Sequence, residues 1–307
     1  MSGRQRLSGV LNAGRRRAGT VLTIVRNAHV DPIVRGEPLV SVVLSTYNWS
    51  NVLRQSVRSV LWQTYPNFEL LVVGDGCTDD SEEVVASFRD ERVRWHNLET
   101  NSGSQAIPNN AGLDRARGEY VAYQGHDDLW HPKHLATMLA RLQSTGGDLG
   151  YCLTELLGPP GSRVRRLAGP SATDLAGAWL PPTSIVHRTE LARQIHGWRS
   201  WEDGGAPDAD FVARARESGA RLIRVSALTA FKFPSAFRPN AYRERPSHEQ
   251  EAYVRRIERE RFFVERELAA LALRRLSPLK PREVADFRHL ADPKAQFAYL
   301  RRVRGLD

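Results

Sequence analysis

Two acidic clusters in this chain each follow a short apolar run that is typical of a buried β-strand. The first, residues 75–80, comes directly after the run 68–73, and the second, residues 126–128, comes shortly after the run 120–123. Open α/β sheets bind ligands at the carboxyl ends of their strands, so both clusters are expected at a ligand-binding edge. Carboxylates gathered there are candidates for holding a nucleotide, a cation, or both.

The elements that carry these clusters follow from the periodicity of apolar residues. Short β-branched runs alternate with segments of helical spacing, which is the pattern of a mostly parallel, doubly wound α/β sheet. The expected strands are residues 39–45, 68–73, 93–96, 120–123, 149–153, 183–187 and 221–225. Helices are expected between them, one opened by Pro132 and one over residues 207–218. Asp79 or Asp80 is expected to cap the helix after the first cluster.

The flanks of this central part differ in composition, which divides the chain into three regions. Residues 1–36 form a basic N-terminal segment, residues 37–235 the α/β domain, and residues 236–307 a helical C-terminal extension. Within the domain, residues 158–180 are rich in Gly, Pro, Ala and Arg without a clear period and are expected to form a long surface loop. Residues 247–276 predict one long charged helix. Its apolar positions are expected to pack against the main domain or against a second subunit in a homodimer.

Charge and cysteine content restrict the class of protein. The chain has 307 residues, a net charge of +9 and two cysteines, Cys77 and Cys152, which are too few for a disulfide framework. It contains neither an apolar run long enough to span a membrane nor an apolar signal core, so we expect a cytoplasmic protein. Nearly all its cations are arginines, as a GC-rich genome would produce. The basic segment 1–36 is either a solvated tail or a contact to anionic lipid at the inner membrane face. No nucleic-acid recognition motif is present, so no nucleic-acid partner is expected.

Four ordered segments resemble the family 2 glycosyltransferases, which have the GT-A fold. The matching residues are LVSVVLSTYNWSNVLRQSVRSVLWQTYPNFELLVVGDGCTDD, then NSGSQAIPNNAGLDRARGEYVAYQGHDDLWHPKHL, and later GWRSWEDGGAPDADFVARARESG. They are similar to the Thr-Tyr-Asn turn, the DDGSTD segment, the ARNxG helix and the D-x-D segment before Trp-x-Pro of that family, and the last stretch is similar to its GGFDE and ED-x-DL segments. The resemblance covers residues 38–224. It implies a nucleotide-binding half followed by an acceptor-binding half.

The resemblance implies a nucleotide site at the first cluster. Asp75 matches a carboxylate that accepts hydrogen bonds from the base or the ribose, while the acid that precedes it in the family is Gly74 here. The residues expected to flank the nucleotide with Asp75 are Ser45, Thr46, Tyr47 and His126. Two of these have a plainer alternative, because Tyr47 could pack under its loop and a lone histidine such as His126 is often structural.

The second cluster is the expected metal site. A divalent cation neutralises the charge that develops on a departing diphosphate, and oxygen ligands suit Mg²⁺ or Mn²⁺. Asp127 matches the last carboxylate of D-x-D and is the predicted ligand, with Asp128 as a second one. The first acid of that motif is Gly125 here, which makes the strictness of metal dependence an open point. Asp128 has an equal claim to cap the turn before Pro132.

The third expected group is a general base. An acceptor hydroxyl attacks when a base removes its proton, and Asp208 matches the catalytic carboxylate of ED-x-DL. The preceding Glu of the family is Pro207 here. An Asp at the start of a helix also acts as a cap, and Glu202 and Asp203 form a rival acidic pair. The resemblance implies an inverting, metal-assisted transfer from a nucleotide-diphosphate sugar.

We expect a UDP-sugar as donor, and a saccharide, a lipid-linked sugar or a natural product as the hydroxyl-bearing acceptor. The alternative is a catalytically weakened nucleotide-sugar-binding protein on the same fold. It is motivated by the three replaced acids at Gly74, Gly125 and Pro207.

Overall fold

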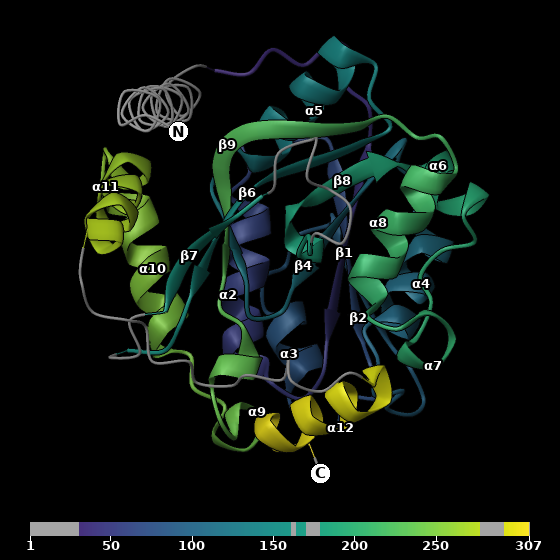
Figure 1. The fold of residues 1–307 in the computed structure, drawn as a ribbon, viewed down its shortest axis with the longest axis vertical. Coiled ribbons are helices and arrows are strands. Elements are labelled where there is room, and N and C mark those ends of the chain that lie inside the picture. The colour runs from purple at the N-terminus through teal and green to yellow at the C-terminus, as the bar shows by residue number, and fades with distance from the viewer. Residues whose placement is uncertain (1–30, 161–163, 170–178, 277–291, 307) are drawn as a thin grey trace, which may run out of the picture.

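The computed structural model describes residues 31–160, 164–169, 179–276 and 292–306. Residues 1–30, which include most of the basic N-terminal segment, lie outside them. A single twisted sheet runs through the described part, with helices on both faces (Figure 1). Its strand order is β3-β2-β1-β4-β8-β6-β9-β5, and β7 pairs with β6.

The first half of the sheet is parallel and carries both acidic clusters. Its strands are β1 (Val40–Thr46), β2 (Phe68–Gly74), β3 (Val93–Asn97) and β4 (Tyr120–Gly125). In register, Thr46 pairs with Gly74 and Ser45 pairs with Gly125. The carboxyl ends of β1, β2 and β4 therefore lie side by side, as the alternating sequence pattern predicts.

The second half of the sheet is mixed. Its strands are β5 (Leu129–Trp130), β6 (Leu149–Leu157), β7 (Arg165–Ala168), β8 (Ile185–Arg188) and β9 (Leu222–Lys232). β8 runs antiparallel to both β4 and β6, β6 and β9 are parallel, and β5 is antiparallel to β9. This arrangement brings the carboxyl end of β9 beside the residues that follow β4.

Alternate residues of the strands face two helical layers. One layer contains α2 (Ser50–Leu61), α3 (Ser81–Ala86) and α5 (His134–Thr145), and the other contains α4 (Ala106–Arg115), α6 (Thr189–Gln194) and α8 (Pro207–Glu217). In β1, Val42 and Leu44 pack in the first layer and Val43 packs in the second. This period of two is what a strand buried on both faces requires.

The C-terminal extension is helical, as predicted, but the predicted single helix over residues 247–276 is wrong. The structure has α9 (Ala241–Glu244), α10 (His248–Arg259), α11 (Phe263–Leu276) and α12 (Pro293–Arg304). The chain turns at Glu260, which takes an extended conformation. α10 packs on α2 and α11 packs beside β7, and one straight helix could not reach both.

The apolar positions of α10 and α11 pack against this chain's own sheet. Ile257, Phe263 and Leu268 join one cluster with residues of β5, β6 and β9. The first of the two alternatives, packing on the main domain, is therefore confirmed for these residues. The homodimer stays a prediction.

Two further predictions, one of a loop and one of a strand, need correction. The composition of residues 158–180 predicts a loop, but Arg165–Ala168 is strand β7, paired antiparallel with the end of β6. Residues 161–163 and 170–178 lie outside the described part. The last strand, expected over residues 221–225, continues to Lys232 because it pairs with β6 across an irregularity near Leu153. Polar Ser226 and Thr229 interrupt the apolar run and hide this extension from the sequence pattern.

Candidate active site

Asp75 lies directly after β2, and the loop before α4 holds its carboxylate. Oδ1 accepts a hydrogen bond from the backbone N–H of Ser102 at 3.0 Å, and Oδ2 accepts one from the side-chain amide of Asn101 at 2.9 Å. Burial raises the pKa of this carboxyl, and the N–H donors of Ser102 and Gly103 act in the opposite direction. A carboxylate accepts about four hydrogen bonds, so Asp75 retains capacity for N–H or O–H groups of a ligand.

The preceding glycine has no room for a side chain. A Cβ at Gly74 would lie 2.4 Å from Oδ1 of Asn97 and 2.8 Å from the ring of Trp95. Asn97 also binds the backbone of Cys77 through both ends of its amide, at 2.8 and 2.9 Å. At position 74, where the family resemblance leads one to expect an acid, an asparagine and a tryptophan therefore fill the space. Asn97 also fixes the turn that follows Asp75.

His126 connects the end of β1 to the C-terminal extension. The backbone N–H of Tyr47 donates to Nδ1 at 3.3 Å, and the Thr46 hydroxyl lies 3.0 Å from the same atom. The hydroxyl of Tyr242 lies 3.2 Å from Nε2. A backbone N–H can only donate, so Nδ1 is the acceptor and Nε2 carries the proton. Burial lowers the pKa of His126, and the ring is neutral at pH 7.

The residues predicted to flank a nucleotide lie together at this edge. Ser45 is aligned with Val73 of β2 and Gly125 of β4. Behind them the rings of Trp49, His126 and Tyr242 pack mutually, with centroids 5.2–5.7 Å apart. Tyr47 is partly exposed at the rim of this aromatic cluster, and its ring centroid lies 6.3 Å from that of Tyr242.

The second acidic cluster contains a lysine partner that comes from β9. Nζ of Lys232 lies 2.9 Å from Oδ2 of Asp128, and the backbone N–H of Phe233 donates to Oδ1 at 3.1 Å. Burial raises the pKa of Asp128 to about 6, so the carboxyl is ionised at pH 7. Burial alone lowers the pKa of Lys232, but the charges of Asp128, Asp127 and Asp208 outweigh it and raise the pKa. Asp128 does not cap the turn before Pro132.

Asp208 lies in the first turn of α8 and is 8% exposed. The indole N–H of Trp179 donates to Oδ2, and the backbone N–H of Ala209 donates to Oδ1 at 3.0 Å. Burial raises the pKa of this carboxyl, and the hydrogen bond from Trp179 opposes that effect. Pro207 occupies the start of the helix, where a proline costs no hydrogen bond. A buried carboxyl with a raised pKa has the character of a general base.

Asp79 has a structural role, which differs in detail from the predicted cap. Its Oδ1 accepts from the N–H and the hydroxyl of Ser81, and its Oδ2 accepts from the N–H of Ser50. One carboxylate therefore binds the first residues of both α3 and α2. Asp80 occupies the cap position of α3 but makes no side-chain hydrogen bond there.

Several residues of this site escaped the sequence analysis. Lys232, Tyr242, Asn101, Ser102 and Trp179 all contact predicted site residues. One signal was present for Lys232. Lysine occurs at only four positions of this arginine-rich chain, so a lysine near the end of an apolar run was unusual. Tyr242 lay in a stretch without periodicity and gave no comparable signal.

The acidic cluster fits a divalent cation only in part. A Cβ at Gly125 would lie 2.6 Å from Oδ2 of Asp128, so the position that the resemblance assigns to another acid is already filled. Both oxygens of Asp128 have protein partners. Within the described residues, no group of three or more His, Cys, Asp and Glu is arranged to hold a metal. Asp127 remains as a carboxylate that would bind a cation shared with the phosphates of a ligand.

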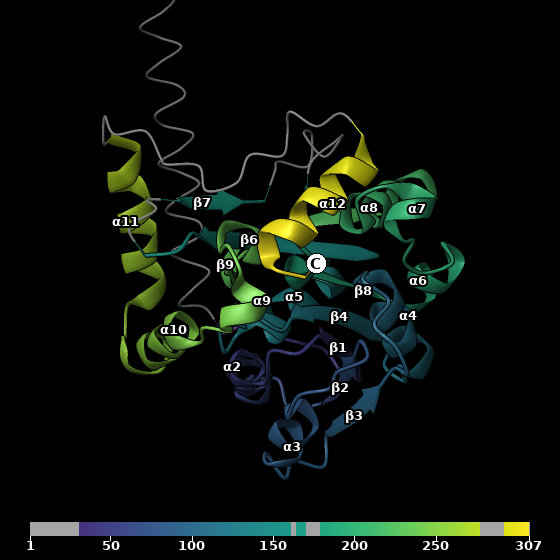
Figure 2. The same cartoon turned by 90° about the horizontal axis from the view of Figure 1, so that it is seen from below.

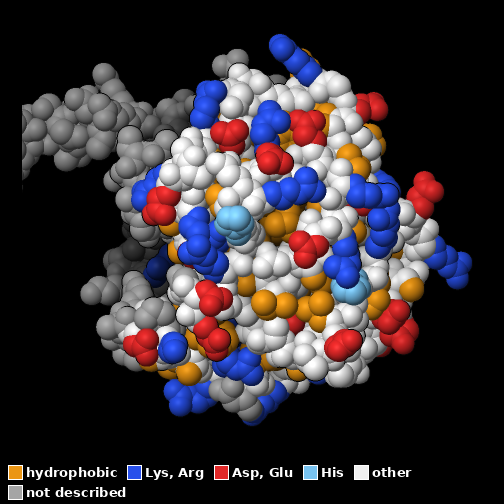
Figure 3. All heavy atoms as spheres, turned by 90° about the vertical axis from the view of Figure 1, so that its right-hand side faces the viewer, with side chains coloured by type: hydrophobic (Ala, Val, Ile, Leu, Met, Phe, Trp, Pro, Cys, Tyr) orange, Lys and Arg blue, Asp and Glu red, His pale blue; other side chains and the backbone are white. Residues whose placement is uncertain are grey.

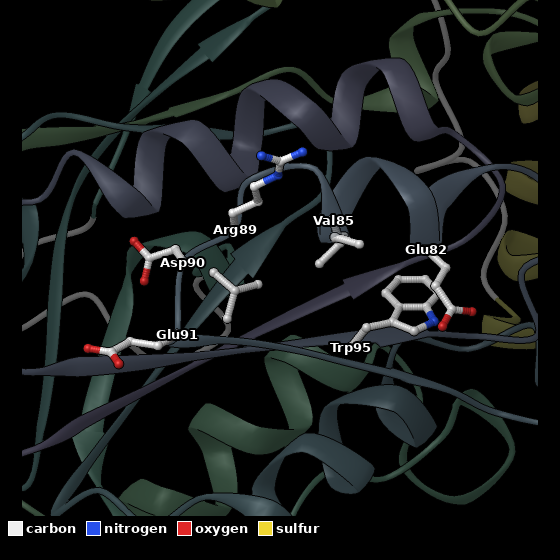
Figure 4. A pocket seen from close by; sticks show the side chains of 8 residues that line it. Glu82, Val85, Arg89, Asp90, Glu91 and Trp95 are labelled. Carbon is white, nitrogen blue, oxygen red and sulfur yellow. The ribbon is translucent and has the colours of Figure 1, made fainter.

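A hollow lies away from these carboxylates, between α3 and β3 (Figure 4). Glu82 and Trp95 lie at one end of it, and Arg89, Asp90 and Glu91 lie at the other. Its charged residues are three acids, Glu82, Asp90 and Glu91, and one base, Arg89. On the side of the molecule formed by α4, α6, α7 (Trp201–Gly204) and α8, acidic and basic side chains are intermixed (Figure 3).

Solved structures share this fold. Staphylococcus aureus TarS 1–349 in complex with UDP-GlcNAc matches with a TM-score of 0.55 and 21% identity, over 86% of this chain and 81% of that one. The mannosyltransferase PcManGT from Pyrobaculum calidifontis, in complex with GDP-Man and Mn²⁺, matches with a TM-score of 0.52 and 18% identity, over 95% and 96% of the two chains. The sheet with acids at its strand ends and these likenesses define a fold of the GT-A glycosyltransferase type.

Part of the chain is similar in sequence to glycosyltransferases. Residues 41–154 match the model of glycosyl transferase family 2. The putative teichuronic acid biosynthesis glycosyltransferase TuaG of Bacillus subtilis (strain 168) is 38% identical over 129 residues, which are 40% of this chain and 51% of TuaG. The glycosyltransferase GlyG of Streptococcus pneumoniae serotype 4 is 36% identical over 185 residues, 52% of this chain and 59% of GlyG. The chain thus spans less than two thirds of the length of these relatives.

Among the described residues, none of the helices combines the length and the apolar character needed to cross a bilayer.

Proposed function

We propose that this chain is a glycosyltransferase, which moves a sugar from a nucleotide-diphosphate donor to the hydroxyl of an acceptor. The observation that carries the proposal is the Asp128–Lys232 ion pair at the strand ends, whose ammonium group is also influenced by the charges of Asp127 and Asp208. The family match supports it. Two of the neighbouring structures are complexes with UDP-GlcNAc and GDP-Man, which supports a nucleotide-sugar donor. A UDP-sugar is the donor that we favour.

The nucleotide half of the donor would bind at the end of β1 and β2. Asp75 would accept hydrogen bonds from the base or the ribose, since its carboxylate is oriented by Asn101 and Ser102 and retains free acceptor positions. Ser45, Thr46 and Tyr47 would flank the nucleoside. His126, neutral and held by Tyr242, would lie near the ribose or the diphosphate.

In the transfer step, Asp208 would act as the general base. The acceptor oxygen forms a bond to C1 of the sugar while the bond from C1 to the diphosphate oxygen breaks. The electron pair of that bond leaves with the nucleoside diphosphate, and the acceptor proton moves to Asp208. The raised pKa of this buried carboxyl makes it a stronger base than an exposed Asp. Direct displacement inverts the configuration at C1, as the family resemblance implies.

A Mg²⁺ or Mn²⁺ ion would be held by Asp127 together with the donor's phosphates. Asp128 would be a second ligand if the ammonium group of Lys232 moved away from it. Such an ion supplies charge neutralisation to the departing diphosphate. The Mn²⁺ in the PcManGT complex supports this assignment. The acceptor would approach from the side of α8, and we expect it to be a saccharide, a lipid-linked sugar or a natural product.

A catalytically weakened nucleotide-sugar-binding protein is the second candidate. The filled spaces at Gly74 and Gly125 favour it, because an acid at either position would require the neighbouring side chains to move. The two candidates differ in turnover. A transferase releases nucleoside diphosphate slowly from its donor even without an acceptor, whereas a binding protein does not.

One screen tests both. Thermal unfolding is measured with UDP-GlcNAc, GDP-mannose and a dTDP-sugar, each with Mn²⁺ and with EDTA, and donor hydrolysis is followed in parallel. We expect one nucleotide to raise the Tm selectively, because a ligand that binds only the native state stabilises it. Selective stabilisation without hydrolysis would favour the binding protein. If no donor stabilises the folded protein in either condition, the proposed donor site is wrong.

A further inference from the structure

The charge of the acidic cluster is already compensated from within the chain. Lys232 is at the end of β9, its side chain is 18% exposed, and one of its three N–H groups is directed at Asp128. An ammonium group has three donors, so two remain for other acceptors. The charges of Asp127 and Asp208 also act on Lys232, so the ammonium group lies within electrostatic reach of all three carboxylates.

The Asp128–Lys232 pair occupies the place of a carboxylate that the family resemblance assigns to position 125. Oδ2 of Asp128 lies 2.6 Å from where a Cβ of residue 125 would be. An Asp at that position could not be accommodated unless the pair moved. The missing side chain at Gly125 therefore leaves the space that the Asp128–Lys232 pair needs.

A second cation reaches the cluster from the C-terminal helix. Arg304 ends α12, and its Nε is buried without a hydrogen-bond partner among the described residues. Its charge acts on His126 and on Tyr242, which contact each other. The carbonyl of Val303 accepts from the N–H of Asn240 at 2.9 Å and fixes this end of the helix beside α9. Figure 2 shows α12 lying across this end of the molecule, and its neighbours are α9 and α7.

The ammonium group of Lys232 thus faces Asp128, and the guanidinium group of Arg304 acts on His126, which adjoins Asp127, so the cluster has two single positive charges beside its two carboxylates. The same balance would otherwise require one divalent ion. An incoming diphosphate would meet N–H donors of both cations, and charge-assisted hydrogen bonds to phosphate are among the stronger ones in proteins.

We propose that Lys232 and Arg304 bind the diphosphate of the donor and neutralise it as it departs, so that the chain's own cations supply most of what a divalent metal ion supplies at such sites. This proposal rests on the proposed function. The leaving group departs as the nucleoside diphosphate with the electron pair of the C1–O bond, and the ammonium and guanidinium groups stabilise its charge without transferring a proton.

The test compares the affinity for UDP and GDP with that for UMP and GMP by calorimetry, in EDTA and in Mn²⁺. The wild-type chain should bind the diphosphate that it prefers nearly as well in EDTA as in Mn²⁺. The double variant Lys232→Met/Asp128→Asn removes the ion pair without leaving a buried unpaired charge. It should bind that diphosphate at least about tenfold more weakly and the monophosphate little changed.

Three further variants control for structure. Lys232→Arg keeps the charge and should retain diphosphate binding. Arg304→Ala should weaken it, whereas Arg302→Ala, an exposed arginine of the same helix, should leave it unchanged. Tm values near that of the wild type show that each variant is folded.

Binding that requires Mn²⁺ in the wild type and is unchanged in the double variant would overturn the role of Lys232 and Arg304 while leaving the proposed function intact. Absence of nucleotide binding by the folded wild type in both conditions would remove the proposed function, and this proposal with it.

Discussion

Asp75 and Asp128 are both buried carboxylates at the strand ends, but the chain holds them in different ways. Asp75 is bound by two neutral donors, an amide and a backbone N–H, which orient it and leave its charge in place. Asp128 is bound by an ammonium group, which cancels its charge. The first arrangement suits a group that must accept hydrogen bonds from a neutral nucleoside. The second suits a region that must tolerate a diphosphate.

The largest effect should come from replacing Asp208, the proposed base, which is held neither like Asp75 nor like Asp128. Asp208→Asn keeps the shape of the side chain but cannot take a proton, so kcat should fall by about 10²–10⁴-fold. Donor affinity, measured by calorimetry, should be unchanged. Glu202→Gln, an exposed acid of the rival pair, serves as the control. A variant Asp208→Asn with normal kcat would exclude this residue as the base.

The pH profile gives the same residue a second test. A protonated Asp208 cannot act as a base, so kcat should fall about tenfold per pH unit below its pKa. Burial raises that pKa, so the decline should begin at a higher pH than for an ordinary Asp. A profile that stays flat down to the normal range of an exposed carboxyl would contradict this assignment.

Asp75→Asn should weaken donor binding with a smaller effect on kcat. Hydrogen bonds to a charged group contribute about 1.5–3 kcal/mol, which corresponds to a loss of roughly tenfold to a hundredfold in affinity. The loss should be the same for mono- and diphosphates, since Asp75 is expected to contact the nucleoside. Asp80→Asn, an exposed acid of the same cluster, is the control. A loss confined to diphosphates would place Asp75 near the phosphates and end the contrast with Asp128.

Gly125→Ala should destabilise the fold through the Asp128–Lys232 pair. The added Cβ would approach Asp128 to 2.6 Å, and overpacking of this kind costs about 1–3 kcal/mol, measurable by urea unfolding. Gly150→Ala is a milder comparison, with its nearest side-chain atom at 3.3 Å. Gly125→Asp should likewise lose stability rather than gain affinity for Mn²⁺. A stable Gly125→Asp variant with tighter Mn²⁺ binding would show that the Asp128–Lys232 pair separates at little cost in stability.

The smallest effect is expected for Tyr242→Phe. This change removes the hydroxyl that contacts Nε2 of His126 at 3.2 Å and keeps the ring packing. The free energy of unfolding should decrease by about 0.5–1.5 kcal/mol, the usual contribution of one hydrogen bond. Unchanged stability in urea would mean that His126 is held by Thr46 and the Tyr47 backbone alone.

The sequence was most informative where local pattern decides structure. The parallel strands carry β-branched runs of period two, and their carboxyl ends must meet at one edge. For this reason the sequence pattern alone places Asp75, Thr46 and Asp127 near one another. The roles assigned to them remain predictions, because position alone does not fix chemistry.

What could not be predicted depends on contacts between distant segments. Lys232 meets Asp128 only because β9 extends past its polar interruption, and Tyr242 meets His126 only because α9 folds back over α2. No local periodicity encodes either contact. The turn at Glu260 lacks the Gly or Pro that normally ends a helix, since tertiary packing of α10 and α11 imposes it.

The late position of Lys232 and Tyr242 in the sequence has a consequence for biosynthesis. As the ribosome delivers the chain, Asp127, Asp128 and His126 emerge more than a hundred residues before the groups that contact them, with separations of 104 and 116 residues. Contacts of such long range form slowly. The acids of the site must therefore stay hydrated until β9 and α9 have left the ribosome. Before that point, the strand ends of the nascent chain carry Asp127 and Asp128 without the ammonium group of Lys232.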